Sequence, residues 1–221
     1  MDVTANNDSV VDIAAQAILH GIKAGHYAPG QRLIEAELIK RFSISRTALR
    51  EAFLRLQGDG LVQIERHRGA IVRHLSKDEL RWTFAVRREL EGLAAALAAP
   101  VLAADPTELC RLCDIAAEAA RKSDMQSFST ANDAFHKLIR TASGNPVLDQ
   151  AAQRLGNTIL LAQFRGPLEQ EMMSGSLAEH DAMVQTLLTG DATAARVAAE
   201  AHVDASLQRF LSLPNGFFAT P

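Results

Sequence analysis

Cysteine is scarce in this sequence, which excludes a disulfide framework. Its two cysteines, Cys110 and Cys113, stand one helical turn apart in the segment ELCRLCDIAA, among leucine and alanine. A disulfide framework needs several spread cysteines. A zinc site built on this pair would need a second Cys or Cys/His pair at ligand spacing, and the neighbouring sequence has none. We therefore expect both cysteines to be packing residues of a helix.

Long uncharged apolar runs are also missing, and so is a basic N-terminal segment followed by one. A membrane span needs roughly 20 consecutive apolar residues, and a secretory signal needs the basic and then apolar order. We therefore expect a soluble, cytoplasmic protein with no membrane partner. Its 221 residues, 48% of them hydrophobic, suffice for a real core and favour two modest domains.

Negative charge is in slight excess, and it is unevenly distributed along the chain. The first 77 residues hold 11 Lys and Arg against 8 Asp and Glu, whereas the remainder holds 12 against 18. Such a division is typical of a protein in which a basic domain binds a polyanion and an acidic domain does not. An asymmetry of this size is weak evidence alone.

The N-terminal segment has the order of elements of a winged helix-turn-helix. A helical period over about 9–25 ends at the turn HYAPG, and a short helix over 34–42 precedes a third helix that is capped by Ser45. Two β-prone runs, LVQI and AIVRHL, follow, and the basic segment ERHRG between them indicates a hairpin. The sequence therefore predicts a winged helix-turn-helix domain over residues 1–75.

The third helix has an outward face that suits DNA. Its leucine, alanine and phenylalanine stripe points inward, so Arg46, Thr47 and Arg50 are left outside near the N-terminal end. Arginine bonds guanine or phosphate, and a helix N-terminus favours phosphate oxygens. A solvated charged face is the alternative for each arginine alone, but the order of elements and the basic hairpin tip favour DNA. The candidate DNA-binding residues are Ser45, Arg46, Thr47, Arg50, His67, Arg68 and Gly69.

This domain resembles that of the GntR family of bacterial transcription regulators. The resemblance rests on the start PGQRL, the recognition helix SRTALREA and the passage from GLV to the RG of the wing. It implies that Arg55, further along the helix, touches the DNA backbone or solvent. The operator contacts that it implies are Arg46, Thr47 and Arg50 in the helix, with Arg68 and Gly69 at the wing tip.

Beyond residue 75 the pattern is helical throughout. Apolar periods separated by breakers such as AAP, SGNP, RGP and TGD predict helices, and no strand pattern occurs. We therefore expect an all-α bundle over residues 76–221 and a mainly α protein overall. The expected helices span roughly 77–99, 105–122, 124–142, 146–164, 172–189 and 191–212.

Three histidines fall where helix geometry can bring them together. His136 follows Asn132 by one turn, so an imidazole nitrogen and an amide oxygen share a face. His180 and His202 lie about ten residues before and about eleven after the turn TGD, so antiparallel packing places them at one level. They share an ion or, as is usual for a lone histidine on an apolar face, are hydrogen-bonded core residues.

The second domain resembles the FCD ligand-binding domain of the FadR-like branch of the same family. The resemblance rests on RRELEGLAAALAA, on NDAFHKLIRTASGN and on the last two histidines. Many members hold a divalent metal, of the zinc, nickel or manganese class, with one oxygen residue and three histidines. The implied ligands are Asn132, His136, His180 and His202. Asparagine replaces the usual aspartate, which should weaken metal affinity, and Asp133 points about a third of a turn away.

Arg87 lies in an otherwise apolar stripe that runs on to Leu97. A buried guanidinium needs a partner. The resemblance implies a small carboxylate effector that bonds the metal on one side and Arg87 on the other. An internal salt bridge to an acid such as Glu91 or Asp133 is the alternative.

Together these features predict a transcription regulator, a repressor rather than an activator. As a homodimer, it would bind a near-palindromic operator in double-stranded DNA and respond to a small organic acid. One alternative is a metal-dependent hydrolase, since these also use three protein ligands, but no HExxH-like motif occurs and Glu179 lies on a different helical face from His180. The other alternative is a DNA-binding dimer without metal or effector.

Overall fold

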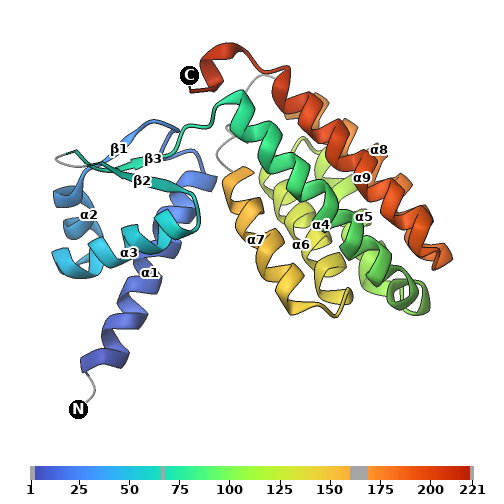
Figure 1. Ribbon diagram of the computed structural model, residues 1–221, viewed down its shortest axis with the longest axis horizontal. Coiled ribbons are helices and arrows are strands. Elements are labelled where there is room, and N and C mark those ends of the chain that lie inside the picture. Colours follow the sequence, from blue (N-terminus) through green and yellow to red (C-terminus); the bar gives the residue numbers. More distant parts are fainter. Residues whose placement is uncertain (1–2, 66–67, 160–168, 220–221) are drawn as a thin grey trace. The chain divides into compact units, whose positions relative to one another are not determined.

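The structure is a computed structural model that describes residues 3–65, 68–159 and 169–219 (Figure 1). Helices dominate it, and its three short strands lie in the N-terminal part. The prediction of a mainly α protein with an N-terminal winged helix-turn-helix is confirmed.

Contacts divide the chain into two units. The first unit contains the residues up to Lys77, those from Pro214 on, and a short stretch that begins at Arg154. The second unit contains Asp78–Gln153 and the later segment that ends at Leu213. The C-terminal end returns to the first unit, where the backbone N–H of Ala219 donates to the carbonyl of Leu75.

The first unit has the predicted helices and hairpin, and one further strand. The strands form an antiparallel sheet of order β1-β3-β2. The first strand has two residues, too few for an alternating pattern, so sequence periodicity could not predict it. The first helix begins at Val3, earlier than expected. The elements are α1 (Val3–Lys23), β1 (Arg32–Leu33), α2 (Glu35–Phe42), α3 (Arg46–Gly58), β2 (Val62–Glu65) and β3 (Gly69–Val72).

The core of the first unit includes the contact between α1 and α3. Val11 and Ala14 of α1 pack with alanines of α3, and all of these side chains are buried. The predicted inward stripe of α3 is buried as well, which turns its opposite face to solvent. That stripe consists of Leu49, Ala52, Phe53 and Leu56.

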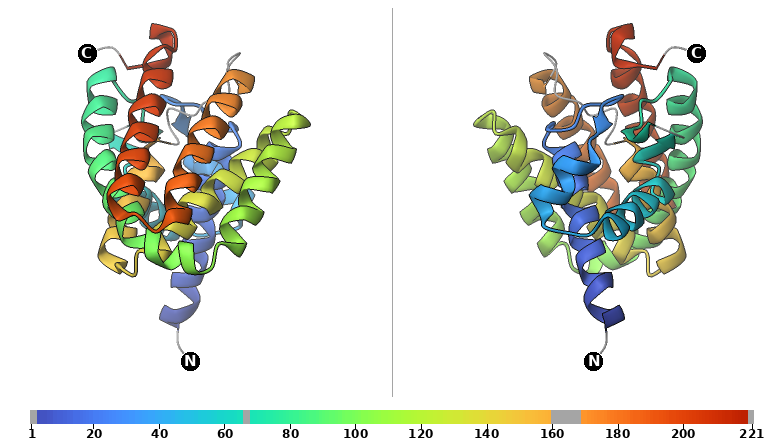
Figure 2. Two further views of the ribbon diagram at one scale, coloured as in Figure 1. Left: turned by 90° about the vertical axis from the view of Figure 1, so that its right-hand side faces the viewer. Right: turned by 90° about the vertical axis from the view of Figure 1, so that its left-hand side faces the viewer.

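After the sheet the described chain is helical, as predicted. In the left-hand view of Figure 2, α8 and α9 run side by side, and the short turn between them makes them antiparallel. The last residues expected for α7 lie outside the described residues. The helices are α4 (Lys77–Ala104), α5 (Thr107–Arg121), α6 (Met125–Ala142), α7 (Pro146–Ile159), α8 (Glu169–Thr189) and α9 (Ala192–Leu211), followed by the 3₁₀ turn η1 (Asn215–Phe217).

The first of these helices, α4, continues through Pro100, where the sequence predicted its end. A proline inside a helix loses a backbone hydrogen bond and costs about 3 kcal/mol. Ala98, Ala99 and Leu102 around it are buried in the core of the second unit, and burying the leucine alone contributes about 1.5–3 kcal/mol. Leu97 is 42% exposed, so the expectation that it shares the inward stripe of Arg87 was wrong.

A helix that spans a membrane must have both a sufficient length and an apolar composition. Within the described residues, no single helix is both long and apolar enough to cross a bilayer; α4 and α5 pass such a test only as a pair, bent by 106°.

Candidate DNA-binding surface and histidine cluster

Ser45 caps α3 and fixes how its first turn is presented. Its Oγ accepts a hydrogen bond from the backbone N–H of Ala48 at 3.1 Å. The candidate side chains of this turn are all exposed, as a DNA-reading surface requires. They are Ser45, Arg46, Thr47 and Arg50.

Arg46 and Arg50 share one acidic neighbour. In each, Nε lies 3.8 Å from a carboxylate oxygen of Glu35 at the start of α2, and the two side chains remain 70% and 66% exposed. A separation of 3.8 Å is longer than a hydrogen bond, and exposed pairs contribute at most about 1 kcal/mol. Glu35 therefore biases the direction of both arginines and leaves them accessible to a polyanion.

Arg55 has an internal partner that the sequence did not reveal. It makes an ion pair with Asp12 of α1, and its side chain is 44% exposed. This contact joins the two helices that form the core of the first unit, so Arg55 serves the fold in addition to facing solvent.

The tip of the hairpin is basic and open. Arg68 is 71% exposed, and its Nη1 lies 3.0 Å from Glu65 Oε2. Gly69 has φ +80°, in the left-handed region that glycine tolerates best, and it lets the chain enter β3. His67 lies outside the described residues, so its predicted DNA contact stays a prediction.

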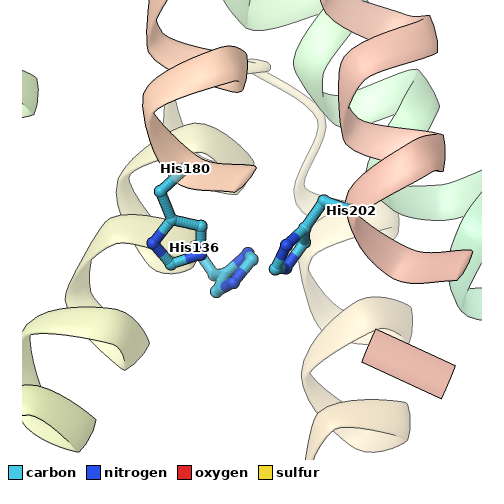
Figure 3. Close-up of side chains that lie close together, drawn as sticks. All are labelled: His136, His180 and His202. Carbon is cyan, nitrogen blue, oxygen red and sulfur yellow. The ribbon is translucent and has the colours of Figure 1, made fainter. Parts of the chain in front are cut away.

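Three histidines from three helices converge in the second unit (Figure 3). They are His136 of α6, His180 of α8 and His202 of α9, and they are 9%, 4% and 4% exposed. One ligand atom of each lies within 4.8 Å of the others. The ring centroids of His180 and His202 are 4.9 Å apart, which confirms that the turn TGD brings them level.

Burial disfavours the charged form of His180 and His202. It lowers the pKa of His180 to about 2, with the nearby His136 and His202 adding to the shift. It also lowers the pKa of His202, although a hydrogen bond with Glu179 opposes the change. Neutral imidazole is the form that binds a metal ion.

Glu91 of α4 links Arg87 to the cluster. One carboxylate oxygen pairs with Arg87 Nε, and Oε2 lies 3.3 Å from His136 Nδ1. Oε2 is buried and lacks a well-aligned hydrogen bond in the described part of the chain. Burial raises the pKa of Glu91, but the charges of Arg87 and His136 outweigh it, so the pKa lies well below its ordinary value. The internal salt bridge that the sequence left open is therefore present.

A second acid, Glu179 of α8, holds His202. Its Oε2 lies 2.9 Å from His202 Nδ1 and accepts a hydrogen bond from Arg209 Nη2 at 2.7 Å, while Arg209 Nη1 donates to Oε1. Burial raises the pKa of Glu179, but the hydrogen bonds from Arg209 and His202 bring it to about 2. Sequence reasoning missed this contact. Successive helical residues point about 100° apart. When His180 faces the cluster, its neighbour Glu179 therefore points to a different side, and here that side is α9.

Asn132, the predicted oxygen ligand, is partly buried one turn before His136 on α6. Its neighbour Asp133 is exposed. The placement of Asn132 agrees with the shared face that the sequence indicates, and its role as a ligand stays a prediction.

Known families and proteins resemble both parts of the chain. Residues 11–72 match the family described as "Bacterial regulatory proteins, gntR family". Residues 82–205 match the family described as "FCD domain". The galactonate operon transcriptional repressor of Escherichia coli K12 is 28% identical over an aligned length of 224, and the alignment covers 91% of this chain and 95% of that protein. The probable D-xylose utilization operon transcriptional repressor of Paenarthrobacter nicotinovorans is 29% identical over 214 residues, or 94% and 92% of the two chains.

Among solved structures, Escherichia coli McbR/YncC superposes with a TM-score of 0.79 at 22% identity, covering 91% of this chain and 97% of that one, which supports the fold. The FCD match alone covers more than half of the chain. The family and the relatives named above are transcription regulators and not enzymes, which removes the hydrolase alternative. The chain is a DNA-binding transcription regulator and belongs to the GntR family, in the branch with a C-terminal FCD domain.

Proposed function

We propose that this regulator is a metabolite-responsive repressor. A divalent ion held by the histidine cluster binds a small organic acid, and the bound acid changes the affinity of a homodimer for its operator. The observation that carries the proposal is the convergence of three imidazoles from three helices, with one ligand atom of each within 4.8 Å of the others.

The residues of the cluster fit a divalent transition metal. His136, His180 and His202 would hold the ion, with Asn132 as the candidate oxygen ligand. Imidazole suits zinc and nickel, and oxygen ligands suit manganese. Three protein ligands leave room for a further ligand, so the bound ion would supply a Lewis-acidic position for an effector carboxylate.

Arg87 is the candidate second contact of the effector. It is already paired with Glu91, so an incoming carboxylate would have to compete with Glu91 or share Arg87 with it. An effector changes a conformational equilibrium only through contacts that differ between the two states. In one state Arg87 would pair with Glu91, and in the other it would pair with the effector carboxylate. Because Arg87 and Glu91 both lie on α4, this exchange would act directly on that helix.

DNA binding in this proposal depends on the exposed first turn of α3 and on the hairpin tip. Arg46 and Arg50 would reach base edges or phosphates, with Ser45 and Thr47 beside them. Arg68 and Gly69, together with His67, would meet an adjacent groove. A protein that binds operator DNA works in the cytoplasm of a bacterium, and a two-fold dimer reads a near-palindromic site.

A second copy of the chain would cover an exposed apolar face of α4. Its side chains follow one another at spacings of four and seven residues, which places them on one side of the helix. Large exposed apolar patches mark interaction surfaces. The stripe consists of Trp82, Val86, Leu93, Leu97 and Val101, which are 68%, 53%, 37%, 42% and 54% exposed.

The proposal is tested on chelator-treated protein. Zinc, nickel and manganese are added singly and the unfolding temperature is measured, since an ion that binds the native state must stabilise it. Organic acids are then screened with and without the ion, and hits are tested for release of a fluorescent operator fragment selected from random DNA. Light scattering gives the mass of the free and bound protein.

Stabilisation by an ion, followed by acid-dependent operator release from a dimer, supports the proposal. A protein that binds operator but gains no stability from any of the ions, and whose operator affinity no acid changes, is the regulator without metal or effector.

A further inference from the structure

The hydrogen bond between His202 and Glu179 determines which ring nitrogen of His202 carries a proton. Both carboxylate oxygens of Glu179 accept a hydrogen bond from Arg209, so Glu179 meets His202 as a hydrogen-bond acceptor. The partner atom, His202 Nδ1, lies 2.9 Å from Glu179 Oε2 and must therefore carry the hydrogen. In a neutral imidazole, the other nitrogen, Nε2, is then left with its lone pair free.

From this geometry we propose that Glu179 and Arg209 form a positioning pair for the metal site, which fixes His202 as the Nδ1–H tautomer and presents its Nε2 to the ion. The proposal rests on the metal site proposed above. Neither residue would touch the ion, and both would act through His202.

Arg209 fixes Glu179 in turn. Its two terminal nitrogens donate to the two carboxylate oxygens, a forked arrangement that restricts rotation of the carboxylate plane. Gly175, about one turn before Glu179 on α8, leaves room for the guanidinium, because a Cβ at that position would lie 3.1 Å from Arg209 Nη1. Glu179 is thus held from one side by arginine and turned to His202 on the other.

The histidine on α6 provides a contrast within the same cluster. Glu91 Oε2 comes to 3.3 Å from His136 Nδ1 but makes no well-aligned hydrogen bond there. The pair at Glu179 therefore has the geometry that selects a tautomer, whereas Glu91 contributes negative charge. Partners of this orienting kind typically change metal affinity by about 10- to 100-fold when they are mutated.

The test compares two carboxylate variants of the full-length protein. Glu179→Gln removes the charge that holds His202. Glu108→Gln is the matched control, because Glu108 also accepts two hydrogen bonds from one arginine, Arg111, but on an exposed part of α5, which carries none of the three clustered histidines. Zinc affinity is measured by competition with a chromophoric chelator, and circular dichroism checks that each variant is folded.

We expect Glu179→Gln to weaken zinc binding by about 10- to 100-fold and Glu108→Gln to leave it within about twofold. Equal affinities for folded Glu179→Gln and wild-type protein would overturn the proposal. A wild-type protein that binds no zinc, nickel or manganese would instead refute the metal site on which it rests.

A second measurement needs neither a bound metal nor the Glu179→Gln variant. Long-range proton–nitrogen correlation spectra of the metal-free wild-type protein report which ring nitrogen of each histidine is protonated, and a His202→Gln variant assigns the signals. The proposal requires Nδ1–H at His202. An Nε2–H tautomer there contradicts it, whatever the zinc affinity.

Discussion

The DNA-binding surface and the histidine cluster differ most in their exposure to solvent. Arg46 is 70% exposed and held only loosely by an acid at 3.8 Å, whereas His180 is 4% exposed and its pKa falls to about 2. The surface is suited to a large charged partner that brings its own counter-charge. The cluster is suited to a small ligand, because its three histidines are buried among helices. One chain thus offers two candidate sites, one exposed and one buried.

The sharpest way to break this comparison is to remove one histidine. His180→Ala should weaken zinc binding by more than about 100-fold, since removing a ligand costs more than removing an orienting partner. The control is His26→Ala, which removes an exposed histidine of the first unit. Titration with a competing chelator measures both. If both variants lose zinc equally, or neither loses any, the ion does not bind at the cluster.

The second way tests the exposed surface. Arg50→Ala should weaken operator binding by about 1–3 kcal/mol, or about 5- to 150-fold in Kd, because it removes a fork that bonds base edges or phosphate. Arg111→Ala, an exposed arginine of α5, is the control. Fluorescence anisotropy at fixed salt measures the affinities. Unchanged binding by Arg50→Ala would remove the first turn of α3 from the DNA interface.

The sequence predicted the exposed surface better than the buried one, for a physical reason. Each side chain in the first turn of α3 is placed by local rules, the cap at Ser45 and the helical period, so neighbours along the chain were enough. The partner of Arg55 is 43 residues away on α1, and no local rule connects the two.

The histidine cluster was predictable only in part. The turn TGD set the level of His180 and His202 because it joins consecutive helices. The contacts of Glu179 with His202 and Arg209 depend on how α8 rotates against α9, and that rotation is set by packing of the whole bundle. Pro100 failed as a helix end for the same reason, since a local breaker yielded to burial of its neighbours.

Acid should weaken the helices around the histidine cluster, because burial holds His180 in its neutral form in the folded protein. The pKa of His180 is lowered in the folded protein, so the unfolded chain binds the extra proton and stability falls as pH drops below the ordinary value of about 6.5. The loss at about pH 5.5 is about 1.4 kcal/mol from His180, and His202 acts in the same direction.

This loss is measured on metal-free protein by hydrogen exchange of α8 and α9, with rates corrected for their intrinsic pH dependence. A His180→Leu variant should show a smaller change. Equal protection at both pH values in the wild-type protein would mean that the cluster accepts protons in the folded state and is less shielded than its burial indicates.

The smallest effect is expected at Arg55, which tests where the exposed surface ends along α3. Arg55→Ala removes a half-exposed ion pair with Asp12, and such pairs contribute at most about 1 kcal/mol. Asp12→Ala should have the same effect on urea unfolding, and the double variant should add little to either, because both changes remove one interaction. Operator affinity of Arg55→Ala should stay within about twofold of wild type, in contrast to Arg50→Ala. A large loss of operator binding at Arg55 would extend the DNA-binding surface by a full turn, and its partner Asp12 would then compete with DNA for the same guanidinium.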